Sequence, residues 1–177
     1  DSGGIYRSNI DGSGKENIAS SGGTSQSYLA LDIADSRLYW LLTAAPATFS
    51  RLSLDGSGVQ ELIGLAANQR YSTFLALDLT NKKMYFRSNN SNNTDYLMRR
   101  KNMDGTGSVE DVISGLGGKS PDGIALDVAN GKIYWASEAS KTIYRANLDG
   151  TGEEILVTGL NRPAGLDLDL VNGKMYW

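Results

Sequence analysis

The stretch that decides the fold runs from residue 123 to residue 152 and reads GIALDVANGKIYWASEASKTIYRANLDGTG. It contains two motifs that recur along the chain. The first is Asp-Gly-Ser/Thr-Gly, with aspartates 44, 49 and 45 residues apart: Asp11, Asp55, Asp104 and Asp149. The second is an aspartate followed seven residues later by tyrosine and another aromatic residue, and it begins at Asp32, Asp78, Asp127 and Asp169. A period near 45 residues predicts a repeat array or a propeller.

Each period predicts four short strands, because apolar, β-branched and aromatic runs alternate with clusters of Gly, Asn, Asp and Ser. The first strand, such as residues 124–126, is almost wholly apolar, and we expect it to lie deepest in the fold. The second carries the Tyr-aromatic pair, whose side chains point to opposite faces and can pack against both neighbouring sheets. The third ends at the Asp-Gly turn, and the fourth is short and polar, as suits an outer edge. Four antiparallel strands per period describe a propeller blade.

Three segments carry a family resemblance: PDGIALD at 121–127, KIYW at 132–135 and IYRANLDG at 143–150. They resemble the YWTD repeats of low-density lipoprotein receptor-type β-propellers, and the resemblance covers essentially the whole chain. It implies a six-bladed ring whose protein ligands bind on one face. The internal copies depart from the motif after the aromatic pair, where Leu-Leu, Arg-Ser and Ala-Ser replace Thr-Asp.

We therefore expect residues 1–177 to form one all-β propeller region of about four blade-repeats. The sequence begins within a blade motif, at residues 5–7, and ends within another, at residues 175–177. Two arrangements fit this pattern. The ends can pair to seal a ring of four blades, or the chain can be a portion of a six-bladed ring or a longer array. We favour the portion, because arrays need capped ends.

Composition excludes several functional classes. The chain has no histidine and no cysteine, so it cannot build a typical zinc site, a Ser-His-Asp triad or a thiol nucleophile. A net charge of −3 with mixed signs offers no basic stripe for nucleic acid, and no apolar run is long enough to enter a membrane. We expect a protein that is not an enzyme and that needs no cofactor.

The repeated aspartates after the first strands suggest either calcium ligands around a channel or structural caps. Repetition favours structure, with each carboxylate accepting backbone N–H bonds or pairing with the repeated third-strand arginine. We accordingly predict no metal site. The Asp-Gly motifs predict tight turns between the third and fourth strands.

Strand alternation sends the loops to two edges of the ring. We name each connection by the positions in the repeat of the two strands that it joins, so that connection 4-1 leads from the fourth strand to the first strand of the next repeat. Turns 1-2 and 3-4 are nearly the same in every repeat, whereas connections 2-3 and 4-1 vary. Variable loops on a rigid scaffold commonly carry recognition. Aromatic and cationic residues are favoured interface anchors. The candidate contacts are Tyr28, Arg70, Tyr71, Lys119 and Arg162, together with Asp167, which replaces an alanine found in the other repeats. Each also has a plain structural interpretation, since Tyr28 aligns with Phe74 and fits a core, and the charges can simply be solvated.

Two N-glycosylation sequons, at Asn89 and Asn92, lie in the longest 2-3 loop. An asparagine-rich polar loop also creates such sequons by accident. Glycans would place the chain outside the cell or in the secretory lumen.

These patterns favour a non-enzymatic extracellular scaffold that binds another protein through its variable edge. One alternative is a structural subunit of a glycosylated fibre or surface layer that stacks against copies of itself. A further alternative is a calcium-dependent propeller lactonase, which would need a non-repeating set of Glu, Asn and Asp residues.

Overall fold

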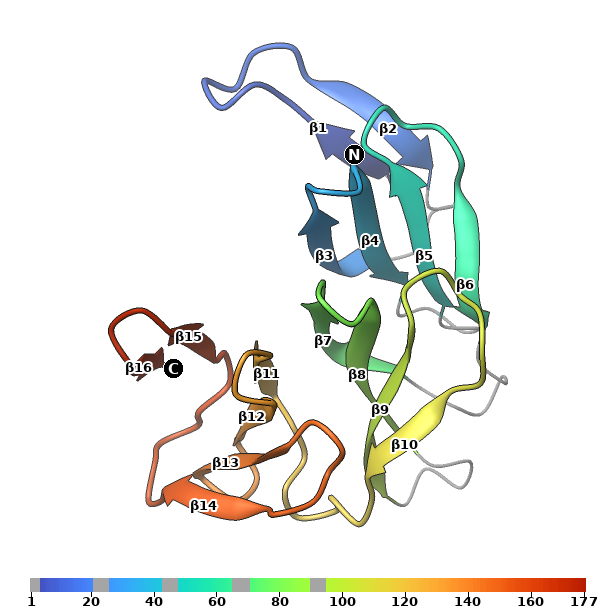
Figure 1. Cartoon of the computed structure of the whole chain (residues 1–177). Helices are drawn as coiled ribbons and strands as arrows, with labels where there is room; N and C mark the ends of the chain where they lie inside the picture. Colours follow the sequence, from blue (N-terminus) through green and yellow to red (C-terminus); the bar gives the residue numbers. More distant parts are fainter. Residues whose placement is uncertain (1–3, 21–25, 43–47, 65–70, 90–94) are drawn as a thin grey trace.

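A computed structural model describes residues 4–20, 26–42, 48–64, 71–89 and 95–177. The regular structure of these residues consists of antiparallel β-strands, without a helix (Figure 1). The strands are short and are separated by turns rich in Gly, Asn and Asp, as the sequence predicts. The described part of the chain also holds no helix with the length and apolar character that crossing a membrane requires.

Three sheets contain four strands each, paired in chain order, and we call them blades 1 to 3. Blade 1 consists of β3 (Gln26–Asp32), β4 (Arg37–Leu42), β5 (Thr48–Ser53) and β6 (Gln60–Gly64). Blade 2 consists of β7 (Tyr71–Asp78), β8 (Lys83–Asn89), β9 (Tyr96–Asn102) and β10 (Glu110–Ile113). Blade 3 consists of β11 (Gly123–Asp127), β12 (Lys132–Ser137), β13 (Thr142–Asn147) and β14 (Glu154–Val157).

Two further sheets are hairpins at the ends of the described chain. The first hairpin is β1 (Gly4–Arg7) with β2 (Glu16–Ser20), and the last hairpin is β15 (Asp167–Asp169) with β16 (Lys174–Tyr176). The five sheets follow an open arc, with β3, β7, β11 and β15 along its inner side, each in contact with the next (Figure 1). The two hairpins lie at opposite ends of the arc, so they are not paired into a sealed blade.

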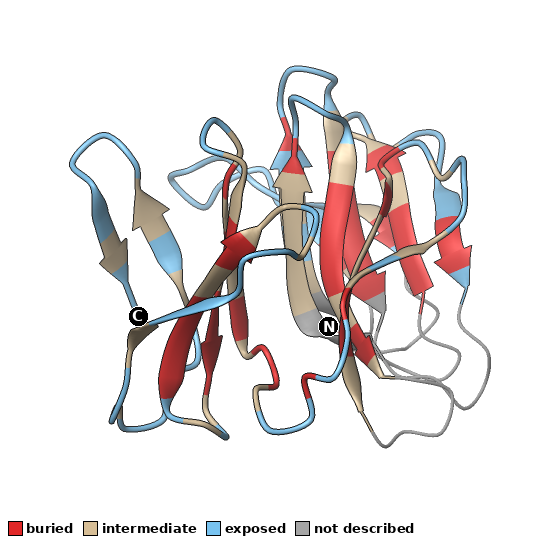
Figure 2. Ribbon diagram, turned by 60° about the horizontal axis from the view of Figure 1, so that its bottom comes forward, coloured by how far each residue is buried: buried red, intermediate tan, exposed pale blue. Residues whose placement is uncertain are grey.

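The expectation that the first strand lies deepest is wrong. In β3, Leu29 and Leu31 are 56% and 51% exposed. The longest buried runs lie in second and third strands such as β8 and β5 (Figure 2). The first strand is the inner edge of its sheet, whereas the second has a strand on each side and a sheet against each face. The fourth strands do lie at the outer edge and are more exposed, as predicted.

The Tyr-aromatic pair connects each sheet to both of its neighbours. Tyr39 and Phe86 belong to the apolar cluster between blades 1 and 2. Trp40 belongs to the cluster between the first hairpin and blade 1, and Tyr85 to the cluster between blades 2 and 3. The prediction that adjacent aromatic side chains pack against different sheets is confirmed, and follows from the two-residue period of a strand.

The Asp-Gly motifs form the tight 3-4 turns that the sequence predicts. The Asp104 carboxylate accepts hydrogen bonds from the Thr106 backbone N–H at 2.8 Å and from its hydroxyl at 2.6 Å. Asn102 donates its side-chain amide to the same hydroxyl at 3.0 Å. The carboxylates of Asp11, Asp55 and Asp149 make the same two bonds to the Ser or Thr two residues on. The polar side chains of each turn are thus hydrogen-bonded to other groups of the same turn.

The repeated aspartates after the first strands cap the 1-2 turns. Asp78 accepts both the backbone N–H and the side-chain amide of Asn81, each at 2.8 Å. Asp127 and Asp169 make the same pair of bonds to the asparagine three residues on. The alternative pairing with the third-strand arginine is wrong. That arginine reaches the fourth strand of its own sheet instead, as Arg100 does with Glu110 at 2.8 Å.

The third-strand arginines also cross the seam between neighbouring sheets. Three of them donate to the backbone carbonyl that precedes the Asp-Gly turn of the next blade. The pairs are Arg7 with Leu54, Arg51 with Met103 at 3.0 Å and Arg100 with Leu148 at 3.2 Å. The side chain that fastens the third strand therefore also fastens the seam.

In blades 1 to 3, the first glycine of the 3-4 turn lies against the fourth strand of the preceding sheet. Its contacts there are Gly56 with Ile18, Gly105 with Leu62 and Gly150 with Val112. Gly150 has a φ of 87°, and a Cβ placed on it would overlap the Val112 carbonyl oxygen. Glycine is thus required here both for its backbone angle and for the close approach.

Gly150→Ala and Gly12→Ala separate these two requirements. Both glycines have nearly the same positive φ, but a Cβ on Gly12 meets nothing within 4 Å. Either alanine destabilises the folded chain by about 1 kcal/mol through left-handed backbone strain. Gly150→Ala also forces blades 2 and 3 apart. We expect Gly150→Ala to lower the free energy of unfolding by about 2 kcal/mol more than Gly12→Ala, measured by urea denaturation. Equal losses would contradict the seam contact.

The 3-4 turns also predict sensitivity to acid. Hydrogen bonds from the Thr106 hydroxyl and backbone N–H lower the pKa of Asp104 below its ordinary value. A lowered folded-state pKa stabilises the fold above the unfolded pKa, and this contribution is lost as pH falls through the folded value. Between about pH 5 and pH 2, Asp104→Asn should therefore lose less stability than the native chain. An equal loss of stability by Asp104→Asn and the native chain over this range, followed by urea denaturation, would contradict the role of the Asp104 turn.

Candidate functional site

The described 2-3 and 4-1 connections lie at one edge of the arc and the repeated turns at the other (Figure 2). We call the first of these the variable edge, and its described loops are residues 114–122, 138–141 and 158–166. In blades 1 to 3, the second and fourth strands that precede these connections have nearly the same lengths. The variation between blades therefore lies in the length and sequence of the connections. This edge is the candidate functional site.

Arg87, at the end of β8, organises the variable edge between blades 2 and 3. Its guanidinium is mostly buried and donates to the Ser120 hydroxyl, to the Pro121 carbonyl oxygen and to the Asp122 carboxylate, the last at 3.0 Å. It also lies 4.8 Å from the centre of the Tyr96 ring. Burial lowers the pKa of Arg87, and the attraction of Asp122 opposes that shift.

The sequence interpretation missed Arg87, although a signal was present. Arg87 follows its Tyr-aromatic pair at the position that Leu41 and Ala136 occupy in blades 1 and 3. A charge at an otherwise apolar repeat position is the same signal that singled out Asp167. A charge at this position calls for a carboxylate partner, which the structure identifies as Asp122.

A chain of polar contacts runs from Arg87 across blade 3. Asp122 accepts the backbone N–H of Glu138 at 2.8 Å through its second oxygen. The Glu138 carboxylate in turn pairs with Arg162 at 2.7 Å. We call Arg87, Asp122, Glu138 and Arg162 the edge network. It links β8, the loop before β11, the 2-3 loop of blade 3 and the loop before β15.

Arg162 is the exposed end of the edge network. Its side chain is 76% exposed, and its backbone has a φ of 55° immediately before Pro163. A left-handed φ is uncommon for a residue with a side chain, and residues before proline favour extended angles. Ser36, Lys82 and Lys141 have a similar φ, so the angle is not peculiar to Arg162.

Lys119 lies on the same edge and is held from two sides. Its ammonium pairs with Glu153 and lies 5.7 Å from the centre of the Tyr144 ring. Lys119 donates a hydrogen bond to the Glu153 carboxylate, and this bond raises the pKa of Lys119. Lys119 thus joins the 4-1 loop before blade 3 to the 3-4 turn of the same blade, and remains partly exposed.

The other candidate contacts are scattered. Tyr28 is half-buried, with its ring centre 5.0 Å from that of Phe74, as its core interpretation requires. Arg70 lies outside the described residues. Tyr71 begins β7, but its side chain is outside the described part. Asp167 is exposed on β15, shortly after Arg162 in the chain, and accepts the backbone N–H of Leu168 at 2.8 Å.

The two sequon asparagines differ in their structural context. Asn89 is the last residue of β8 and is half-buried. Asn92 lies outside the described residues. The use of either sequon stays a prediction.

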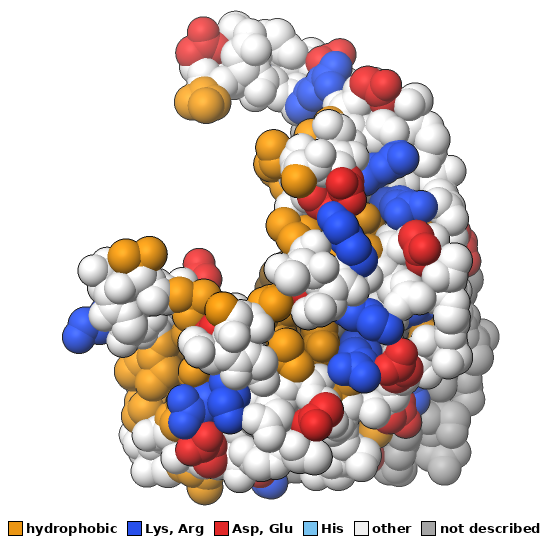
Figure 3. All heavy atoms as spheres, in the orientation of Figure 1, with side chains coloured by type: hydrophobic (Ala, Val, Ile, Leu, Met, Phe, Trp, Pro, Cys, Tyr) orange, Lys and Arg blue, Asp and Glu red, His pale blue; other side chains and the backbone are white. Residues whose placement is uncertain are grey.

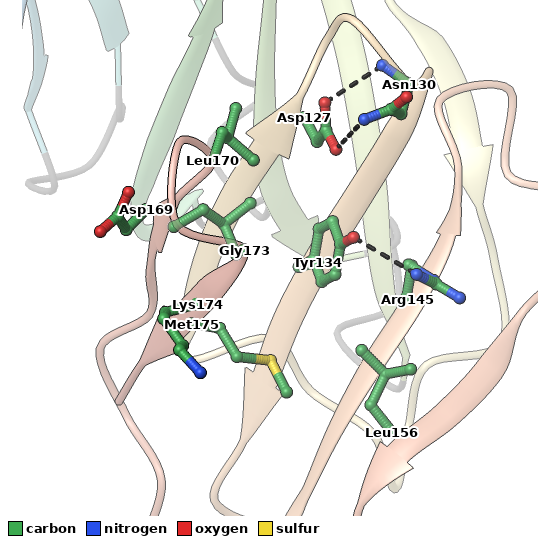
Figure 4. A pocket seen from close by; sticks show the side chains of 11 residues that line it. Asp127, Asn130, Tyr134, Arg145, Leu156, Asp169, Leu170, Gly173, Lys174 and Met175 are labelled. Carbon is green, nitrogen blue, oxygen red and sulfur yellow. Dashed lines mark hydrogen bonds between the residues drawn. The ribbon is translucent and has the colours of Figure 1, made fainter.

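A cleft of about 390 Å³ lies between blade 3 and the last hairpin. Tyr134, Arg145, Leu156 and Met175 are among the residues that line it, and Arg145 points toward the Tyr134 hydroxyl (Figure 4). Asp127 and Asp169 also lie on its wall, yet both are bonded to turn asparagines. Within the described ranges, no group of three or more His, Cys, Asp or Glu side chains is arranged to hold a metal ion.

Comparison with known proteins gives distant relatives. No family model matches the chain. The Protein cueball of Drosophila yakuba is 26% identical over 147 residues, which cover 81% of this chain and 22% of that protein. The Protein cueball of Drosophila sechellia is 24% identical over 146 residues, with the same coverage. The chain spans about a fifth of the length of these curated relatives.

Solved structures match over nearly the whole chain. A chain of the Nidogen/Laminin Complex has a TM-score of 0.75 and 18% identity, covering 93% of this chain and 60% of that one. TolB from Acinetobacter baumannii gives 0.73 and 12%, covering 97% and 41%. A gluconolactonase from Xanthomonas campestris gives 0.70 and 17%, covering 98% and 62%. At these identities the likeness concerns the fold alone, and the chain is an all-β protein built from the four-stranded antiparallel blades of a β-propeller.

Proposed function

We propose that this chain is an extracellular, non-enzymatic scaffold that binds another protein through its variable edge. The observation that carries the proposal is Arg162, which is 76% exposed, paired with Glu138 and held at a left-handed φ. Strain stored at a surface residue is a common feature of ligand-binding positions. Arginine is also among the residues that contribute most to protein interfaces.

The contrast between the two edges supports this proposal. On the repeated edge, polar side chains are used by the turns themselves, as Asp104 and Asn102 are with Thr106. On the described part of the variable edge, the edge network joins four different segments and ends in an exposed guanidinium. Because the network already orders its loops, little conformational entropy would be lost when a partner binds them. A partner surface with carboxylates would complement Arg162 and Lys119.

The proteins of similar fold include both binding proteins and enzymes. We prefer a binding role because of how the aspartate side chains of this chain are bonded. The Nidogen/Laminin Complex supports an extracellular binding role, whereas the gluconolactonase represents the enzymatic alternative. A hydrolase of that kind needs carboxylates free to bind metal or substrate. The repeated candidates here, such as Asp78 and Asp127, are used as turn caps.

Binding should depend on the variable edge and not on the repeated one. The purified chain would be tested by biolayer interferometry against laminin and a panel of other purified matrix proteins. For a binder in this panel, Arg162→Glu should weaken affinity by about tenfold or more. Lys15→Glu reverses one exposed charge on the repeated edge and should change affinity by less than about twofold. No binder in the panel, or equal loss from both variants, would contradict the proposal, provided that both variants keep the native melting curve.

The extracellular location has a separate test. We propose that Asn92 is glycosylated, and that Asn89 is a poorer acceptor because it is half-buried within β8. Expression of the chain behind a secretion signal in a eukaryotic cell should yield a form whose mass falls on treatment with peptide-N-glycosidase. Asn92→Gln should remove that difference, and Asn89→Gln should keep it. A chain that carries no glycan in either case would contradict this part of the proposal.

A further inference from the structure

The 1-2 turn of blade 1 differs from the equivalent turns of the other sheets. In blades 2 and 3 and in the last hairpin, the second carboxylate oxygen of the cap aspartate accepts the side-chain amide of the asparagine three residues on, at 2.6 to 2.8 Å. In blade 1 the residue three after Asp32 is Asp35, which has no amide to donate. Its backbone N–H still donates to the first oxygen of Asp32 at 3.1 Å. The second oxygen therefore needs a donor from another part of the chain.

Lys82 of blade 2 supplies that donor across the seam. Its ammonium donates to the second carboxylate oxygen of Asp32 at 3.3 Å and to the Asp35 carboxylate at 2.6 Å. Asp32 is fully buried, whereas the side chains of Lys82 and Asp35 are about half exposed. A buried carboxylate that lacks a hydrogen-bond donor is costly. The ammonium of Lys82 thus replaces the missing asparagine amide and also neutralises one of two adjacent negative charges.

Lys82 has an unfavourable backbone angle at this position. Its φ is 52°, in the left-handed region that favours glycine. The equivalent residue of blade 3 is Gly131, with a φ of 64°, and that of the last hairpin is Gly173, with a φ of 63°. Blade 1 has Ser36 there, at 51°. A lysine at this position is strained relative to glycine, and its bonds to blade 1 compensate for that strain.

The two positions that meet across the seam change together between repeats. Asparagine at the cap position of one blade occurs with glycine in the 1-2 turn of the next, as Asn81 does with Gly131. Aspartate at the cap position occurs with lysine in the next turn, as Asp35 does with Lys82. Asp35 and Lys82 are 47 residues apart in the chain and meet only because their blades are neighbours. The combination of residues therefore distinguishes this seam from the next one.

The surrounding charges leave Lys82 as the main partner of Asp35. Acidic and basic side chains are interleaved on this face of blades 1 and 2 (Figure 3). One hollow of about 380 Å³ there is lined by Asp35, Arg51, Lys82 and Asp104. Arg51 donates to a backbone carbonyl of blade 2, and Arg37, which also attracts Asp35, donates to a serine hydroxyl of its own blade. The hydrogen bond from Lys82 is the largest influence that lowers the pKa of Asp35.

We propose that Asp35 and Lys82 form a matched pair that selects blade 2 as the neighbour of blade 1. If blade 3 of a second chain docked there during folding, it would place Gly131 opposite Asp32 and leave the buried carboxylate without its donor. Repeat proteins are prone to such misassembly, and a single polar or ionic contact can fix register at some loss of stability. The pair lies at the repeated edge, so it is independent of the binding role that we propose for the variable edge.

A double-mutant cycle tests whether the two residues act together. In the native chain, Lys82→Gly removes the donor and should raise the equilibrium constant of unfolding about fivefold or more, although glycine relieves the backbone angle. In a chain with Asp35→Asn, the asparagine amide can bond to Asp32, so Lys82→Gly should leave that constant unchanged or lower it. Urea denaturation measures all four chains. An equal effect of Lys82→Gly in both backgrounds would overturn the pairing.

The pair can also be transferred to the seam between blades 2 and 3. Asn81→Asp removes the amide donor of buried Asp78 and should destabilise the native chain. The loss should be smaller in a chain with Gly131→Lys, because Gly131 has a φ close to that of Lys82 and free space for a side chain. Gly115→Lys is the matched control, since Gly115 also has positive φ and free space but lies at the variable edge. A smaller loss with both lysines, or with neither, would overturn the rule.

Refolding separates selection from stability. The chain with both Asp35→Asn and Lys82→Gly has the turn residues of the next seam, so we expect it to be at least as stable as the native chain. We also expect a lower yield of the native species and more oligomer after refolding from urea at equal concentration, measured by size-exclusion chromatography with light scattering. Lys141→Gly, which removes a lysine at the same backbone angle from the variable edge, should keep the native yield. Equal yields from the double variant and the native chain would overturn the selective role.

Discussion

A third-strand arginine that donates to a carbonyl of the next blade is the interaction on which the arc depends. A single four-stranded sheet cannot bury both of its faces, so each blade is stable only against its neighbours. Arg51 and Arg100 fix the distance and register of that packing, because each also bonds to the fourth strand of its own sheet. The aromatic pair then fills the space on either side, with Tyr85 and Phe86 in different clusters.

Strand alternation separates the contacts that hold the blades together from the edge that we propose for recognition. The arginine contacts, the glycine approach and the aspartate-capped turns lie at or near the repeated edge, where every blade needs the same geometry. The loops of the variable edge do not make these repeated contacts. Among the described residues, they instead include contacts of one blade pair, such as the ion pair between Arg87 and Asp122. Loop sequences can therefore diverge on one edge without altering the contacts that hold the blades.

Most of the fold could be predicted from the sequence, because each blade repeats the same local rules. The turns around Asp104 and Asp78 follow from their own residues, and repetition identified them as structural. The destination of the arginines could not be predicted, because residue order does not say which carbonyl of the next sheet lies nearby. The exposure of Leu29 was missed because an apolar strand looks the same in a core and along an inner wall. Arg87 could be predicted as exceptional, because Leu41 and Ala136 occupy the same repeat position.

The seam geometry also bears on how the chain acquires its structure during synthesis. Every described strand pairs with its immediate neighbour in sequence, and each new blade packs on the one made just before it. Contacts of this kind carry little loop-closure entropy, so a nascent blade can dock as soon as its fourth strand leaves the ribosome. The third-strand arginine of a finished blade can form its bond to the next blade only after that blade has been synthesised. Folding from the N-terminus onward is thus built into the direction of that hydrogen bond.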